Sequence, residues 1–184
     1  AIDDSFSGNE GSLISVDVST NDSDVDDLTN TLTFTAPATD DAGIGTITDI
    51  SGGNGTFSFQ PNPGNEDFVG EVTFTYTVTD PDGLTDTAVA TITINNQNDA
   101  PNAVNETFAF VEDNPPLSDN VLDNDSDVDG DPVMVDLGTP LVFSDPAFDG
   151  FVTIDAAGNV TYNLPPDFNT NFNVQYQVTD GNGG

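Results

Sequence analysis

Two short segments, about one domain length apart, carry the same six residues and present carboxylates at alternating positions. They are Asn21–Asp26 and Asn124–Asp129, each Asn-Asp-Ser-Asp-Val-Asp. Like charges about 4–6 Å apart repel by roughly 1 kcal/mol in water, and by more where solvent is excluded. The chain contains no Lys, Arg or His, so no side chain supplies the compensating charge. A hard divalent cation that prefers oxygen ligands, Ca²⁺ above all, is therefore the predicted partner of these clusters.

The overall charge excludes several classes of function. The 33 acidic residues and the absence of basic ones give a net charge of −33 over 184 residues. Nucleic acid and anionic membrane surfaces are repelled by such a chain, and no apolar run approaches the length of about 20 residues that a membrane helix needs. We expect no nucleic-acid partner and no membrane insertion. The chain has no Cys, so we expect neither disulfides nor thiol chemistry.

The chain contains two tandem copies of one unit. Ala1–Phe6 matches Ala103–Phe108, and Tyr76–Asp80 matches Tyr176–Asp180. A polar segment that ends in Pro101 separates the copies, and proline disfavours continuation of a strand ladder. We predict two domains, residues 1–97 and 98–184. Because the chain starts at Ala1 without a signal peptide, we expect a mature or excised fragment.

Alternation of apolar and polar residues with period two predicts strands throughout. Glu71–Val78 and Ala88–Ile94 show the pattern most clearly, and Gly-, Pro- and Asn-rich turns separate the strand-like segments. Many short strands at regular spacing predict an all-β chain of two tandem Greek-key β-sandwich domains. The second copy lacks a counterpart of the last predicted strand, Thr85–Ile94. Two explanations remain open: truncation, or a strand donated by another subunit or a following module.

Several motifs together resemble the bacterial cadherin-like family, the tandem immunoglobulin-like calcium-binding repeats of large secreted or surface adhesin-type proteins. Val-x-x-x-Asp-x-Asp occurs at Val18–Asp24 and Val121–Asp127, and the linker Asn96–Pro101 is similar to the family's Asp-x-Asn-Asp-Asn-x-Pro, although one residue shorter. Phe110–Pro115 is similar to the family's acidic motif near the end of the first strand, and Ser7–Glu10 resembles it more loosely. The family's Asp-Arg-Glu motif is absent, and Glu66-Asp67 stands at roughly its place.

The resemblance implies calcium sites at the ends of the domains, where the loops and the linker meet. In the second domain, acidic loop residues are expected to converge on the linker, together with residues from the lower end of the first domain. A second set is expected to serve a junction with an upstream module. Calcium would neutralise the acids and stiffen the linker. The ligands expected at the linker are Asn98, Asp99, Asp125, Asp127, Asp129, Asp180, Glu10, Glu66 and Asp67; those of the outer set are Asp22, Asp24, Asp26 and Asp80.

Three classes of function are compatible with these features to different degrees. The favoured one is a calcium-binding structural or adhesive module of a secreted or cell-surface bacterial multi-repeat protein, such as a biofilm or surface-filament component, whose partners are calcium and neighbouring repeats or other subunits. Extracellular modules need a Kd of only about 10⁻⁴–10⁻³ M, which suits millimolar external calcium. The alternative is a doublet that binds polysaccharide, against which the lack of Trp argues. An enzyme is disfavoured, because only carboxylates remain as acid and base.

A simpler interpretation of the acidic loops also exists. Asp, Asn and Gly form turns, and an acidic surface keeps a protein hydrated. This interpretation does not account for the recurrence of Asp-x-Asp at the same place in both copies.

Overall fold

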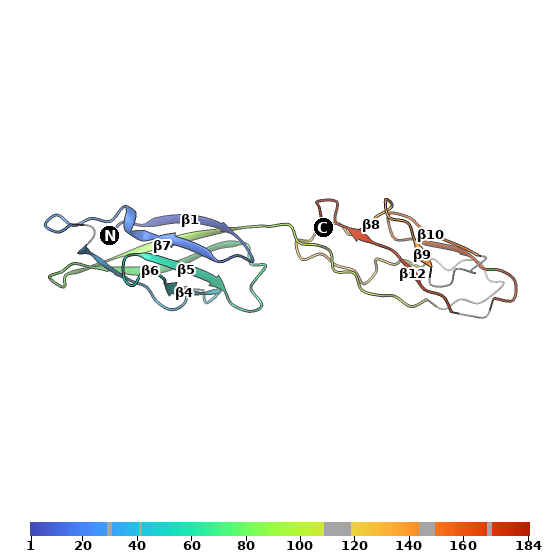
Figure 1. Cartoon of the computed structure of the whole chain (residues 1–184), viewed down its shortest axis with the longest axis horizontal. Helices are drawn as coiled ribbons and strands as arrows, with labels where there is room; N and C mark the ends of the chain where they lie inside the picture. Colours follow the sequence, from blue (N-terminus) through green and yellow to red (C-terminus); the bar gives the residue numbers. More distant parts are fainter. Residues whose placement is uncertain (29–30, 41, 109–118, 144–149, 169–170) are drawn as a thin grey trace. The chain divides into compact units, whose positions relative to one another are not determined.

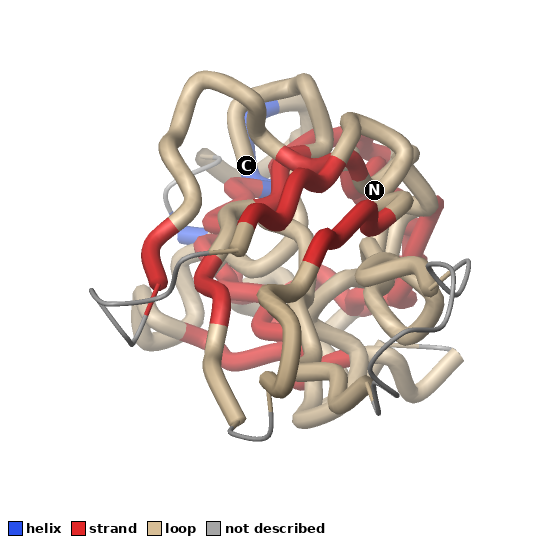
Figure 2. Tube along the Cα trace, turned by 90° about the vertical axis from the view of Figure 1, so that its right-hand side faces the viewer, coloured by secondary structure: helices blue, strands red, loops and turns tan. Residues whose placement is uncertain are grey.

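A computed structural model describes residues 1–28, 31–40, 42–108, 119–143, 150–168 and 171–184. The Phe110–Pro115 motif lies outside these residues. The chain forms two compact units, Ala1–Gln97 (unit 1) and Asn98–Gly184 (unit 2). Strands and loops make up nearly all of the described chain (Figure 2), and within it no helix is long and apolar enough to cross a membrane.

Unit 1 consists of two sheets. One sheet has the strand order β1-β7-β6-β3 and the other β2-β5-β4. Strand β7 runs antiparallel to β6 over ten residue pairs and parallel to β1 over six (Figure 1). The elements are β1 (Asp4–Asn9), β2 (Ile14–Asp17), a 3₁₀ turn η1 (Val18–Thr20), β3 (Thr33–Thr35), β4 (Gly45–Asp49), β5 (Thr56–Pro61), β6 (Gly70–Thr79) and β7 (Thr85–Asn95).

The core of unit 1 is built by the alternation seen in the sequence. Along β6, every second side chain from Val72 to Val78 is buried, and β7 contributes every second side chain from Ala88 to Ile94. Phe57 and Phe59 of β5 enter the same cluster from the other sheet. The predicted β-sandwich is confirmed, because the two sheets pack with their apolar faces against each other.

Unit 2 has shorter strands and a smaller core. Its buried apolar residues include Val135, Ile154 and Tyr162. The pairs β10–β11, β9–β12 and β8–β13 are all antiparallel. The strands are β8 (Met134–Val135), β9 (Val142–Phe143), β10 (Phe151–Ile154), β11 (Val160–Asn163), β12 (Val174–Gln175) and β13 (Val178–Thr179).

The pairing of β8 with β13 repeats that of β3 with β6. Val135 lies opposite Val178, as Phe34 lies opposite Val78. Strands β12 and β13 therefore correspond to β6. In the described part of unit 2, no strand occupies the place that β7 has in unit 1.

A tyrosine, buried in unit 1 and partly buried in unit 2, holds the first segment of each unit. The Tyr76 hydroxyl lies 2.9 Å from Asp4 Oδ2, 3.0 Å from Asp22 Oδ2 and 2.9 Å from the Ile2 carbonyl oxygen. In unit 2, the Tyr176 hydroxyl lies 2.7 Å from Glu106 Oε2 and 3.0 Å from the Val121 carbonyl oxygen. The two units thus repeat a contact between residues more than 50 positions apart.

Two carboxylates crowd around Tyr76, and a hydroxyl carries only one proton. Asp4 and Asp22 are 8% and 4% exposed. Burial raises the pKa of Asp4, and the nearby charge of Asp22 adds to the rise, while the Tyr76 hydroxyl opposes it. The protonated form of Asp4 is therefore favoured by folding.

Asp4→Asn should change how the stability of unit 1 depends on pH. A raised carboxyl pKa in the folded state contributes stability below the ordinary value of about 4, and this contribution is lost as pH rises through the folded pKa. The variant should therefore be the more stable protein at pH 7, with the difference from wild type shrinking on acidification. Urea unfolding in chelator, with hydrogen exchange of β6 amides as the readout for unit 1, measures this.

Asp49→Asn is the matched control. The Ser51 amide is the largest of the causes that lower the pKa of Asp49, so its stabilising contribution exists above the ordinary pKa and disappears as pH falls. The two variants should therefore show opposite pH trends. Parallel trends would contradict the assignment of a destabilising charge to Asp4.

Candidate metal centres

The densest group of carboxylates in unit 2 lies in one loop. One oxygen each from Asp127, Asp129 and Asp131 lies within 4.8 Å of the others. The loop curls because Asp127 Oδ1 accepts the amides of Asp129 (2.9 Å) and Asp131 (3.3 Å). This local turn brings alternate side chains to one side, as Asx turns do.

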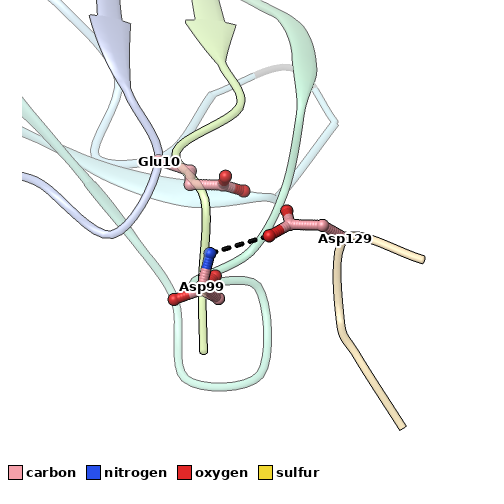
Figure 3. A group of neighbouring side chains, drawn as sticks. All are labelled: Glu10, Asp99 and Asp129. Atoms are coloured by element: carbon pink, nitrogen blue, oxygen red, sulfur yellow. Dashed lines mark hydrogen bonds between the residues drawn. The ribbon is translucent and has the colours of Figure 1, made fainter. Parts of the chain in front are cut away.

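Two other segments of unit 2 converge on this loop. The Asp99 amide donates to Asp129 Oδ2 at 2.7 Å (Figure 3). The Asn182 side-chain amide donates to Asp131 Oδ2, also at 2.7 Å. The start of unit 2, the loop at 127–131 and the segment after β13 therefore surround one cluster of carboxylates.

Asp180 joins the start of unit 2 to its last loop. Its Oδ2 accepts the Asn98 side-chain amide (2.7 Å), and its Oδ1 accepts the amides of Asn182, Gly183 and Gly184. These bonds, that from Asn98 above all, lower the pKa of Asp180 to about 2. Asp180 therefore stays ionised under nearly all conditions.

The loop carries oxygens that hydrogen bonds do not satisfy. Asp125 Oδ2 and Asp127 Oδ2 are buried and have no hydrogen-bond partner in the described structure. A buried acceptor without a partner costs roughly 1–3 kcal/mol, and more when it is charged. Ca²⁺ takes six to eight oxygens from carboxylates, amides and carbonyls, so this donor set fits calcium.

Glu10 lies at the end of unit 1 from which the chain leaves. Only 5% of its surface is exposed. Its Oε1 accepts the Gln97 amide at 2.5 Å, whereas its Oε2 is buried without a partner among the described residues. The Gly11 amide donates to the Glu66 carbonyl at 2.9 Å, so the Glu66 backbone lies at this end. The side chains of Glu66 and Asp67 are exposed, and Glu66 Oε2 accepts the Gly64 amide.

The opposite end of unit 1 holds the outer set of predicted ligands. Asp24 and Asp80 line a pocket of about 230 Å³, together with Asp86 and apolar side chains that include Leu32 and Val78. Asp26 is exposed.

Asp22, in contrast, faces the unit's interior. Its Oδ1 accepts the Ile2 amide at 2.6 Å and its Oδ2 lies beside the Tyr76 hydroxyl. Asp125 repeats this role by accepting the Val104 amide at 2.7 Å. The first Asp of each Asp-x-Asp thus anchors the start of its unit.

Asp131 was not among the ligands predicted from the sequence. The sequence does contain a pattern that points to Asp131, because Asp125, Asp127, Asp129 and Asp131 occupy alternate positions. The first copy lacks this fourth acid, since Leu28 and Thr29 follow Asp26-Asp27, so matching the two copies did not reveal it.

Titration of Asp180 tests the hydrogen bonds at the start of unit 2. Its carboxyl carbon, followed by NMR in chelator, should titrate with a pKa of about 2. Asn98→Ala removes the strongest donor, so the pKa should rise toward the ordinary value of about 3.9. Asn96→Ala, which changes an exposed side chain of the linker, should leave it unchanged. An ordinary pKa in the wild type would contradict the geometry.

Comparisons with known proteins relate the chain to one family of domains. The model of the bacterial cadherin-like domain matches residues 1–96 and again 98–184. Similar solved structures include the human desmocollin-1 ectodomain (14% identity, TM-score 0.48, covering 100% of this chain and 37% of that one) and protocadherin gamma B2 extracellular domains 3–6 (17% identity, TM-score 0.42, 86% and 36%). This chain spans little more than a third of the length of either structure. No curated protein sequence matches it.

Proposed function

This chain belongs to the bacterial cadherin-like domain family, and we propose that it is a calcium-binding structural and adhesive module of a secreted or cell-surface bacterial multi-repeat protein. Cadherin-like domains are typically adhesive and calcium-binding. The observation that carries the proposal is the convergence in unit 2 of Asp127, Asp129 and Asp131, with a buried oxygen on Asp127 that no hydrogen bond satisfies.

Unit 2 supplies most of the proposed calcium ligands. Asp127, Asp129 and Asp131 contribute carboxylate oxygens, with Asp125 next to them. The start of the unit contributes Asn98 and Asp99, which are already tied to Asp180 and Asp129 by hydrogen bonds. Bound calcium lowers the repulsion among these carboxylates. The loop therefore gains rigidity when the ion binds.

Glu10 is the proposed ligand from unit 1. It accepts the amide of Gln97, the last residue of that unit, and Asp99 follows two residues later in the chain. Its second oxygen is buried and has no described partner. A calcium ion that takes this oxygen couples the linker to unit 1 and stiffens the connection between the units. Glu66 and Asp67 are proposed to contribute from the same end.

The outer acids of unit 1 form the second proposed site. Asp24 and Asp80 line one pocket, with Asp26 in the same loop, whereas Asp22 faces the interior and supports the loop from within by accepting the Ile2 amide. We propose that they serve a neighbouring repeat as the linker set serves unit 2. Repeats joined in this way act by extending and presenting a surface rather than by turning over a substrate.

Calcium should stabilise unit 2, and Asp127→Asn should abolish most of the effect. Binding to the folded state alone adds RT ln(1 + [L]/Kd), about 2.7 kcal/mol at a hundredfold excess over Kd. Asn at position 127 retains an oxygen for the Asp129 and Asp131 amides, so the loop geometry is preserved while the charge is lost. Calorimetric titration and thermal unfolding of calcium-stripped protein, compared at matched ionic strength with NaCl and MgCl₂, measure the effect.

Asp123→Asn is the control, because it removes an exposed acid of the same unit outside the cluster. It should leave calcium binding close to that of the wild type. If NaCl stabilised the protein as much as calcium, or if the Asp123 and Asp127 variants lost calcium stabilisation equally, calcium would act only by general charge screening. Either result would contradict the proposal.

Glu10→Gln should separate calcium binding from stiffening of the linker. We expect calcium affinity to fall by roughly tenfold, about 1.4 kcal/mol, because one charged ligand is lost. Residual dipolar couplings should show that calcium narrows the range of inter-unit orientations in the wild type but less so in the variant. Glu71→Gln, an exposed acid on β6, is the matched control. Identical orientation ranges in both variants would contradict the role of Glu10.

A further inference from the structure

We infer that unit 2 carries a site for self-catalysed formation of an ester bond between the side chains of Thr139 and Gln177, with Asp136 as the base. The Thr139 hydroxyl is the nucleophile, and the side-chain amide of Gln177 is the electrophile. The product is a covalent cross-link between the turn that follows β8 and the segment between β12 and β13. This inference does not depend on calcium.

The three reacting groups are in contact. Thr139 Oγ1 lies 2.7 Å from Asp136 Oδ2 and 3.0 Å from Gln177 Oε1. A hydroxyl group carries one proton and two lone pairs, and the shorter contact places the proton on the side of the carboxylate. A lone pair of the same oxygen then remains for the amide of Gln177. A nucleophile within hydrogen-bond reach of a base is the arrangement that covalent catalysis requires.

The turn at residues 136–139 fixes the base and the nucleophile. Asp136 Oδ1 accepts the Gly138 amide at 2.8 Å, and the Thr139 amide donates to the Asp136 carbonyl at 3.3 Å. The Asp136 carboxylate therefore has one oxygen held by the backbone and the other directed at the Thr139 hydroxyl. The hydrogen bonds from Thr139 and then Gly138 lower the pKa of Asp136, so its basic form is present at neutral pH.

The strand ladder holds Gln177 opposite this turn. Val135 pairs with Val178 in β8 and β13, and the Asp136 amide donates to the Gln177 carbonyl at 2.8 Å. The electrophile is thus delivered by the backbone of the folded unit rather than by a chance encounter. Well-oriented groups within one molecule react with effective concentrations of roughly 10⁵–10⁸ M, which is the main source of rate at this site.

Unit 1 has different residues at the corresponding positions. By the register of β3 with β6, Asp136 corresponds to Thr35 and Gln177 to Thr77, which pair across the two strands. Two threonines offer neither a carboxylate base nor an amide to attack. The site therefore belongs to unit 2 alone among the two copies, and unit 1 serves as an internal control.

The reaction releases one molecule of ammonia. Asp136 takes the hydroxyl proton while Thr139 Oγ1 adds to Cδ of Gln177. The tetrahedral intermediate then breaks its Cδ–Nε2 bond, and Asp136 returns the proton to the departing nitrogen. The products are the ester and ammonia, and no oxidant, reductant or cofactor takes part.

The cross-link reinforces a short part of the sheet. Strands β8 and β13 pair over only two residues, so few ladder hydrogen bonds join them. A covalent bond beside this pair restricts the unfolded chain, as a disulfide does, in a protein that has no Cys.

Mass spectrometry of the whole chain, kept folded in chelator at neutral pH and sampled over days, tests the inference. We expect a species lighter by one ammonia. Proteolysis should yield a joined pair of peptides, one containing Thr139 and the other Gln177. Hydroxylamine, which cleaves esters, should separate the pair and leave a hydroxamate at position 177. Ammonia loss by cyclisation of an Asn side chain would leave the two peptides unlinked.

Four variants assign the roles. Thr139→Val should abolish the linked pair, whereas Thr139→Ser keeps the hydroxyl and should retain it. Asp136→Asn keeps an oxygen for the Gly138 amide but loses the base, so linkage should slow by roughly 10²–10⁴-fold. Gln175→Ala, which changes an exposed side chain of β12, should have no effect. Hydrogen exchange of the Val135 amide verifies that each variant is folded.

Unlinked peptides in the folded wild type at every time point overturn the inference. Linkage that persists in Thr139→Val, or that forms equally fast in Asp136→Asn, overturns it as well, because the bond would then involve another nucleophile or need no base at this position.

Discussion

The structure depends on one constraint: 33 carboxylates and no basic side chain. Every acid in or near the core must be stabilised by hydrogen-bond donors, by protonation or by an ion from outside. Hydrogen-bond donors stabilise Asp180, whose carboxylate accepts three backbone amides and the Asn98 side-chain amide. At Asp4, burial beside Tyr76 raises the carboxyl pKa, which shifts the balance toward protonation. The 127–131 loop has too few donors for its acids, which is why it suits the third.

The two acids of each Asp-x-Asp motif have different roles. The first Asp binds the amide near the start of its own unit, as Asp22 does with Ile2 and Asp125 with Val104. The second Asp lies with other acids, at the pocket of Asp24 or in the cluster around Asp127. One motif thus holds the start of its unit with its first Asp and places its second Asp among other acids at the same end of the unit.

Sequence alone predicted the parts that local periodicity controls. The strict alternation at Glu71–Val78 and Ala88–Ile94 gave β6 and β7, because period two assigns each side chain to one face of a sheet. Shorter elements such as β4, with Gly-Thr-Ile-Thr-Asp, carry too few alternations for the same inference. The two acidic Asp-x-Asp loops could also be identified from the sequence. The inward orientation of the Asp22 side chain could not be predicted from the sequence, since it depends on Tyr76, which lies 54 residues away.

The parallel pairing of β1 with β7 has a mechanical consequence. The chain enters unit 1 at β1 and leaves it through β7, and six residue pairs join the two strands from Asp4–Ala90 to Asn9–Asn95. Tension applied between the ends of the unit pulls these strands past each other lengthwise. All their hydrogen bonds then bear load together rather than breaking one at a time, so unit 1 is built to resist being stretched.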